Sequence, residues 1–176
     1  MRYVALLRGI HPGSPRMRNE HLRRVVEGLG HTDVATVISS GNVVFASTIR
    51  SRTRLESSLE AAWPEQLGFT STTIVRSRTD LRRLADNDPF DGAALDTKGL
   101  QVTFLKQEPS ERPHTPLVPA GERFTIVAMD HSTICTVADP SDPGTPDVMR
   151  WIERRFGPGI TTRSWATVNR ILTAFG

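Results

Sequence analysis

The residues best suited to binding chemistry are arginines, hydroxyls and an amide at the predicted ends of strands and helices. Arg8 follows an apolar run, and Arg163 precedes the last predicted helix. A guanidinium group presents a planar fork of donors that matches phosphate and carboxylate. If the strand ends converge, these residue types favour a small anionic or nucleotide-like ligand, bound in a cleft between two subdomains. The candidates for contacting it are Arg8, Ser39, Ser40, Asn42, Arg163 and Thr167.

The same residues also have ordinary structural uses. Gly41 and Asn42 suit a turn, Ser164 suits the cap of a helix, and Arg163 can pair with a carboxylate. The sequence contains no glycine-rich phosphate loop that would decide between the two interpretations. Both therefore stay open at this stage.

Residue types required for catalysis or metal binding occur without the necessary spacing. Cys135 is the single cysteine and lies in an apolar run, so we expect a small buried hydrophobic residue. Asp139 and Asp142 could act as a carboxylate pair, but acidic residues beside prolines are common in turns. The histidines show no paired-ligand spacing; they are His11, His21, His31, His114 and His131. The sequence specifies no catalytic residue, cofactor or metal ligand, and leaves open whether the protein is an enzyme.

Two other functions are alternatives. A nucleic-acid-binding module of the ferredoxin-like type would expose aromatic side chains on its sheet, and Tyr3 and Phe45 lie on suitable strands. Core packing explains both residues equally simply. The other alternative is a protein–protein interaction domain without catalysis, which would use an exposed strand edge.

Bulk properties restrict the class of protein. The chain has 176 residues, of which 38% are hydrophobic and 23% charged, as in globular proteins. No apolar run approaches the roughly 18 residues of a membrane span. A single cysteine cannot form an internal disulfide, so we expect a cytoplasmic protein. All basic residues except Lys98 and Lys106 are arginine, and they are scattered. Oligomeric state is not indicated.

Hydrophobic periodicity predicts an α+β fold. The expected elements of the first half are a strand at residues 2–8, a helix from residue 17 or 20 to 29, a hairpin of strands at 34–39 and 42–46, a helix from 53 and a strand at 70–76. A tight turn is expected at Ser40 and Gly41, and Thr53 with Glu56 suggests a capping box. The order β-α-β-β-α-β is that of the ferredoxin-like split arrangement.

The composition becomes polar and acidic after residue 86, which places a domain boundary near Asp96. We therefore predict two packed subdomains, residues 1–96 and residues 97–176. The second is a smaller α+β unit with a strand at 100–105, a hairpin at 123–138 turning at Asp130 and His131, and two C-terminal helices starting near Thr145 and Ser164.

Several stretches together resemble the family known as domain of unknown function 1697. They are YVALLRGI at residues 3–10, VISSGNVVF at 37–45, DPF at 88–90, VTFL at 102–105 and TTRSWATV at 161–168. The resemblance implies two packed α+β subdomains, the first of them ferredoxin-like, and implies no activity.

The chain departs from the family pattern at polar positions. Family members usually have an Asn-Val-Gly-Gly-Lys-Asn type of loop where this chain has residues 11–16, HPGSPR. They usually have a Gly-Arg-Ser-Lys-Leu type of segment where this chain has residues 143–147, PGTPD, without the lysine. Ser39, Ser164 and Ala166 stand where asparagine is common. A ligand of the relatives would therefore meet a changed site here.

Overall fold

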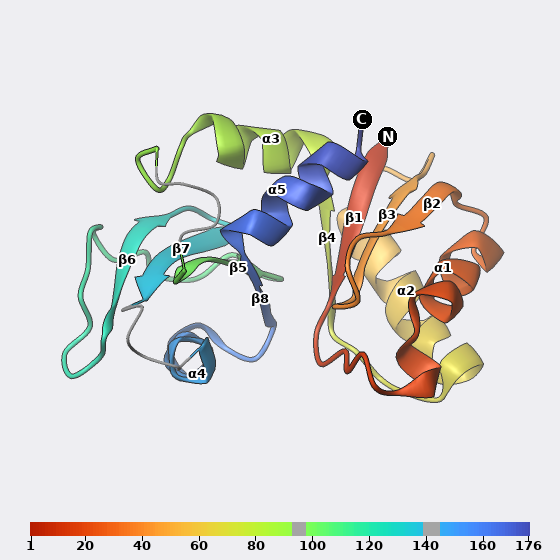
Figure 1. Ribbon diagram of the computed structural model, residues 1–176, viewed down its shortest axis with the longest axis horizontal. Helices are drawn as coiled ribbons and strands as arrows, with labels where there is room; N and C mark the ends of the chain where they lie inside the picture. Colours follow the sequence, from red (N-terminus) through yellow and green to blue (C-terminus); the bar gives the residue numbers. More distant parts are fainter. Residues whose placement is uncertain (93–97, 139–144) are drawn as a thin grey trace. The chain divides into compact units, whose positions relative to one another are not determined.

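The computed structural model describes residues 1–92, 98–138 and 145–176, which form two compact units (Figure 1). Unit 1 contains Met1–Arg83 together with Arg170–Gly176, and unit 2 contains Leu84–Asn169. The predicted boundary residue Asp96 falls outside the described residues. The fold is a mixed α+β fold, as predicted, and it contains two four-stranded antiparallel sheets.

The first sheet has strand β1 near its centre. Its elements in chain order are β1 (Arg2–Leu7), the 3-10 helix η1 (Pro15–Met17), α1 (Asn19–Gly28), β2 (Thr32–Thr36), β3 (Asn42–Ala46), α2 (Arg52–Leu67) and β4 (Thr73–Ser77). The strand order is β2-β3-β1-β4 with all neighbours antiparallel. This is the predicted β-α-β-β-α-β order.

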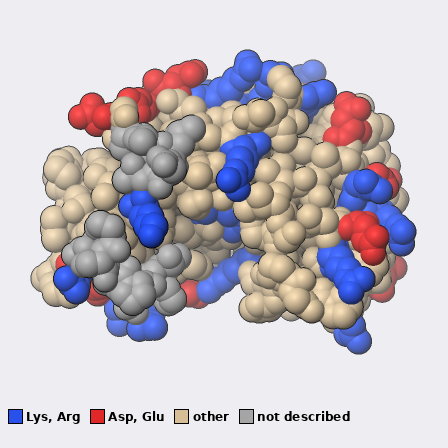
Figure 2. Space-filling view, viewed as in Figure 1, with Lys and Arg blue, Asp and Glu red and all other residues tan. Residues whose placement is uncertain are grey.

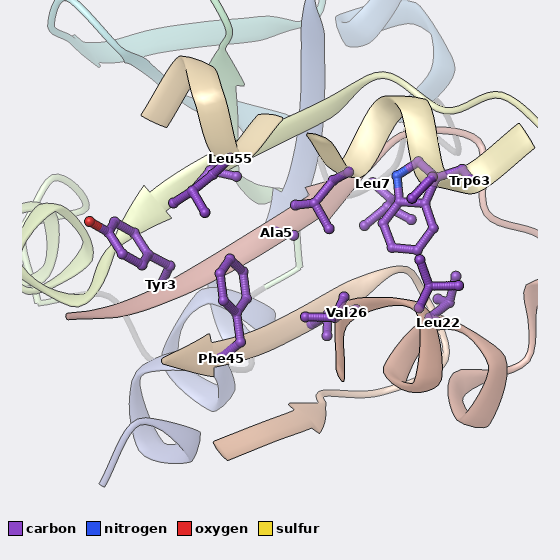
Figure 3. Packing of buried hydrophobic residues seen from close by; sticks show 13 residues of the cluster. Tyr3, Ala5, Leu7, Leu22, Val26, Phe45, Leu55 and Trp63 are labelled. Carbon is purple, nitrogen blue, oxygen red and sulfur yellow. The ribbon is translucent and has the colours of Figure 1, made fainter. Parts of the chain in front are cut away.

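Helices α1 and α2 cover one face of this sheet (Figures 1 and 3). Alternate residues of β1 point to the helices because side chains alternate along a strand. Tyr3 of β1 lies with Phe45 of β3 and Trp63 of α2 in one buried cluster. The indole N–H of Trp63 donates to Thr73 Oγ1 at 2.9 Å. The two aromatic strand residues proposed for nucleic-acid stacking are therefore core residues.

The helix α2 begins two residues earlier than a Thr53 cap would place it. Ser51 is the N-cap, and its hydroxyl accepts a hydrogen bond from the Arg54 N–H at 3.2 Å. The predicted capping box of Thr53 and Glu56 is wrong, because the Glu56 carboxylate is buried and turned toward β4. Pro64 lies inside the helix, and Gly68 ends it in the left-handed conformation that glycine adopts readily.

Carboxylates close the outer edge of β4. Glu60 accepts from the Thr73 N–H, Glu56 from the Val75 N–H and Asp80 from the Ser77 N–H, each at 2.9 Å. These are the alternate N–H groups that β1 does not bond. An edge strand with its donors occupied cannot pair with another chain.

Glu56 also lies 4.0 Å from the guanidinium of Arg76, and both side chains are almost fully buried. We predict that Glu56→Ala lowers the free energy of unfolding by about 3 kcal/mol, because it removes the carboxylate beside a buried cation and the acceptor of a buried N–H. Glu56→Gln keeps an acceptor for Val75 and should cost less. Urea unfolding measures both, with exposed Glu65→Ala on the same helix as the control; equal losses for Glu56→Ala and Glu65→Ala would contradict the prediction.

His31 precedes β2 and is buried against Phe45, with ring centroids 4.8 Å apart. Its Nε2 has no hydrogen-bond partner within the described part of the chain. Desolvation lowers the pKa of His31 below the ordinary value of 6.5. The folded protein therefore resists a proton that the unfolded chain accepts.

We predict that this histidine makes the protein less stable in mild acid. As the pH falls below 6.5, the unfolded chain gains a proton first, so the free energy of unfolding decreases until the lower folded pKa is passed. Between pH 7 and about pH 5, His31→Phe should lose less stability than the wild type. Exposed His114→Gln is the control, and an unchanged pH profile in His31→Phe would refute the prediction.

Unit 2 repeats the strand order of unit 1. Its elements are the C-terminal part of α3 (Arg78–Asp86), β5 (Leu100–Leu105), β6 (Phe124–Met129), β7 (Thr133–Ala138), α4 (Thr145–Phe156), β8 (Ile160–Ser164) and the first part of α5 (Trp165–Ala174). The sheet order β6-β7-β5-β8 matches β2-β3-β1-β4 strand for strand in sequence order. The proline-rich segment between β5 and β6 stands where unit 1 has α1.

The β6–β7 hairpin turns at Asp130 and His131, as predicted. The Asp130 carboxylate accepts four hydrogen bonds, from the N–H and hydroxyl groups of Ser132 and Thr133. Burial raises the pKa of Asp130, but these hydrogen bonds together outweigh burial and hold the pKa below its usual range. The ionised carboxylate of Asp130 therefore stabilises the turn between β6 and β7.

Among the described residues, no helix has the length and apolar character to cross a membrane.

Candidate functional site

Three segments of unit 1 meet at the end of the sheet where β1 finishes. The Leu7 N–H donates to the Gly41 carbonyl at 2.8 Å, which ties β1 to the hairpin loop. The Arg8 N–H donates to the Thr72 carbonyl at 2.9 Å, and the Ser71 hydroxyl donates to the Arg8 carbonyl at 2.8 Å. The backbone on both sides of Arg8 is thus fixed.

The hairpin loop is wider than the predicted turn. Strand β2 ends at Thr36, so residues 37–41 form the loop, which is closed by a 2.9 Å bond from the Val37 N–H to the Asn42 carbonyl. The prediction of a tight turn at Ser40 and Gly41 between strands reaching Ser39 is wrong. Ile38 has φ of +50°, which is rare for a β-branched residue, and its side chain is exposed.

Asn42 holds this loop from inside. Its side chain is 1% exposed, and Nδ2 donates to the Val37 carbonyl and to Ser40 Oγ, both at 3.0 Å. The two hydrogens of the amide are thereby used within the protein. A side chain that is buried and bonded at both ends of a loop can maintain an unfavourable backbone angle such as that of Ile38.

Gly41 brings the loop against the segment after β1. Its φ is +75°, and a Cβ there would lie 2.5 Å from Ile10 Cγ1. Only glycine satisfies both the backbone angle and the contact. The Leu7–Ile10 segment and the hairpin loop are consequently in direct contact.

Of the predicted site residues in unit 1, Ser39 is exposed, Arg8 and Ser40 are half-buried, and Asn42 is buried. They belong to the segments that the bonds above bring together. The divergent loop of residues 11–16 continues from this point; it turns with a bond from the Ser14 N–H to the His11 carbonyl and enters η1.

Arg163 and Thr167 lie in unit 2, at the junction of β8 and α5. The Arg163 guanidinium donates to Thr161 Oγ1 at 2.8 Å and to the Thr162 carbonyl at 2.9 Å. Burial lowers the pKa of Arg163 to about 10, so the group stays charged at neutral pH. Ser164 caps α5, as predicted: its hydroxyl accepts from the Thr167 N–H at 3.2 Å and lies 2.9 Å from Thr167 Oγ1.

The remaining candidates for chemistry are a cysteine and the metal-ligating side chains. Cys135 is 1% exposed, and desolvation with the nearby Asp130 charge raises its pKa to about 12, so it is no nucleophile at neutral pH. Asp139, Asp142 and Gly144 lie outside the described residues. Within residues 1–92, 98–138 and 145–176, no group of three or more metal-ligating side chains gathers.

Sequence comparison identifies the family. The model described as "Protein of unknown function (DUF1697)" matches residues 1–132. The chain belongs to this family. The match confirms the resemblance over the first four of its five stretches, and the stretch at 161–168 lies beyond the matched region. No curated protein matches this DUF1697 chain.

A solved structure shares the fold. The conserved bacterial protein SP0830 from Streptococcus pneumoniae has a TM-score of 0.71 to this chain, with 19% sequence identity. The similarity covers 99% of this chain and 98% of that chain. At this identity the likeness shows the fold alone.

Sequence reasoning missed the supporting role of Asn42. We predict that Asn42→Ala lowers the free energy of unfolding by about 2 kcal/mol, because it leaves the buried Val37 carbonyl without this donor. Ser40→Ala, which removes only a half-buried acceptor, should cost less. Thermal and urea unfolding measure both variants. If Asn42→Ala leaves the free energy of unfolding unchanged, the Asn42 side chain does not stabilise the loop and the prediction is wrong.

Proposed function

We propose that the protein binds a small anionic ligand, such as a nucleotide or sugar phosphate, at the end of the unit 1 sheet. The contacts come from Arg8 and from the hydroxyls of Ser39 and Ser40. The observation that carries this proposal is the hairpin loop, held in a strained conformation beside the backbone of Arg8 by a buried asparagine. Strain that the surrounding bonds maintain is typical of functional sites.

The residue types support an anion rather than a cation or an apolar molecule. Arginine and hydroxyl groups donate hydrogen bonds, and no carboxylate belongs to residues 7–10 or 37–42. A preformed loop loses little conformational entropy on binding. In this proposal Asn42 acts by holding the loop. Arg163 and Thr167 are kept as a second candidate set, tested separately in unit 2.

Nucleic acid is less well supported. Figure 2 shows basic side chains interspersed with acidic ones over α1 and α2, and Arg23 pairs with Glu27 at 3.3 Å on α1. A nucleic-acid surface would concentrate one sign of charge. Tyr3 and Phe45, the only aromatic residues suggested for stacking, are buried.

The test is a thermal-shift screen with nucleotides, sugar phosphates, coenzymes, divalent metals and short oligonucleotides, at low and moderate salt. A ligand at about 100 times its Kd should stabilise the protein by about 2.7 kcal/mol. We predict that one phosphate-bearing compound shifts Tm in the wild type and in Arg24→Gln, an exposed control on α1. Arg8→Gln should weaken binding about tenfold or more, as loss of a charge-assisted hydrogen bond does.

Titration calorimetry on each variant then gives the affinities. Equal affinity in Arg8→Gln and wild type would refute the site at the end of the sheet. Loss only in Arg163→Ala would move the site to unit 2. A salt-sensitive shift with oligonucleotides alone would support the nucleic-acid alternative instead.

A further inference from the structure

The two edge strands of the unit 1 sheet, β4 and β2, differ in how their outward N–H groups are hydrogen-bonded. At one edge, three carboxylates occupy the outward N–H groups of β4. At the other edge lies β2, a mostly exposed strand. A free strand edge is a template for a further strand. The β2 edge is open although the opposite edge, β4, has its N–H groups bonded, and this difference suggests that β2 has a binding role.

The hydrogen-bond pattern identifies the free groups. The Val37 N–H donates to the Asn42 carbonyl, so Val37 and Asn42 form a bonded pair and the neighbouring pair, Thr36 with Val43, is a non-bonded one. The N–H and C=O groups of Thr36 therefore point away from β3. Within the described part of the chain, no group forms a hydrogen bond with them.

In unit 2 the equivalent strand edge pairs with an extended residue of the chain. Its strand β6 occupies the place of β2 in the same strand order. There, Leu117 forms an antiparallel bridge with Ile126, through bonds of 2.9 Å and 2.8 Å between their backbone groups. The chain itself supplies an extended residue to this edge. In unit 1 the corresponding connection forms α1, a helix that packs against β2 and β3 and supplies no extended residue to pair with β2.

A hollow beside β2 provides a place for a side chain. It has a volume of about 230 Å³ and is lined by both apolar and charged side chains, from β1, β2, β3, the end of α5 and the residue after it. Ala35 and Val44 line it together with Phe175. Arg2 and Asp33 also line it, with 3.9 Å between their charged groups. An apolar side chain of moderate size would bury against this lining.

We propose that the β2 edge binds an extended peptide segment of a partner protein, which adds a strand at Thr36 and places one apolar side chain in the hollow. Backbone bonds give such a site affinity, and the pocket gives it specificity. This surface is independent of the anion site.

A second copy of the chain fits this edge less well. Asp33 and Ile38, both with φ of +50°, bound the free stretch, and a bulge interrupts the pairing between Thr32 and Ala35. Such an edge is too short and twisted for two rigid sheets to join. The exposed apolar side chain of a second β2 would be that of Ala35 alone, which is too short to fill the hollow. A flexible segment can follow the twist.

The experiment pans a phage-displayed library of random peptides, each about twelve residues long, against the immobilised full chain. Enriched sequences are synthesised and measured by fluorescence polarisation. We expect them to contain an apolar residue within an extended segment. Thr36→Pro, which removes the outward N–H, should weaken binding about tenfold or more, whereas Thr36→Val should bind as the wild type does. Amide exchange of Thr36 should slow when peptide is bound.

Two measurements avoid any dependence on the folding of Thr36→Pro. Two peptide series are compared, one N-methylated at the odd and one at the even amides, while the protein stays unchanged. Binding should be abolished in the series whose methylated amides face β2, because their donors are removed. Ala35→Leu fills the hollow and should weaken binding. The proposal is overturned if no peptide is enriched, if binding survives both N-methylated series, or if light scattering shows a dimer with the Thr36 amide already protected.

Discussion

The first unit depends on β1 being hydrogen-bonded on both sides. It pairs with β3 along one edge and β4 along the other, and residues Tyr3 to Leu7 are almost fully buried. Its side chains are buried on both faces of the sheet, which explains its unbroken apolar run. Its end then fixes the neighbouring loops, because Leu7 bonds to Gly41 and Arg8 bonds to Thr72.

Three polar side chains, two of them buried and one half-buried, hydrogen-bond to the backbone. Glu56 bonds an edge N–H of β4, Asn42 bonds the hairpin loop, and Asp130 bonds the turn between β6 and β7. Burial of each group is costly, and each is compensated by hydrogen bonds with backbone N–H or C=O groups. The net gain from each group is modest, but its removal exposes the full penalty, so these residues specify one arrangement of the chain.

The repeated strand order extends to details of chemistry. In β4 the Arg76 guanidinium donates to the Val75 carbonyl, and in β8 Arg163 donates to the Thr162 carbonyl, at 2.8 Å and 2.9 Å. A serine follows each arginine. In unit 1 Asp80 bonds Ser77, and in unit 2 Thr167 bonds Ser164. The same strand-to-helix junction, with the same Arg-Ser pair, thus occurs in both units, because the backbone groups to be satisfied are the same.

The sequence by itself determined the α+β class, the β-α-β-β-α-β order, the buried stripes and the family, since apolar periodicity and turn residues act locally. It also predicted the turn at Asp130 and the cap at Ser164, whose partners are close in the chain. Only the tertiary structure decided that Glu56 faces β4 instead of capping its own helix, and that Asn42 supports a wide loop with Ile38 in a left-handed conformation. These outcomes depend on hydrogen bonds between packed elements or on how the hairpin closes, which spacing along the chain does not reveal.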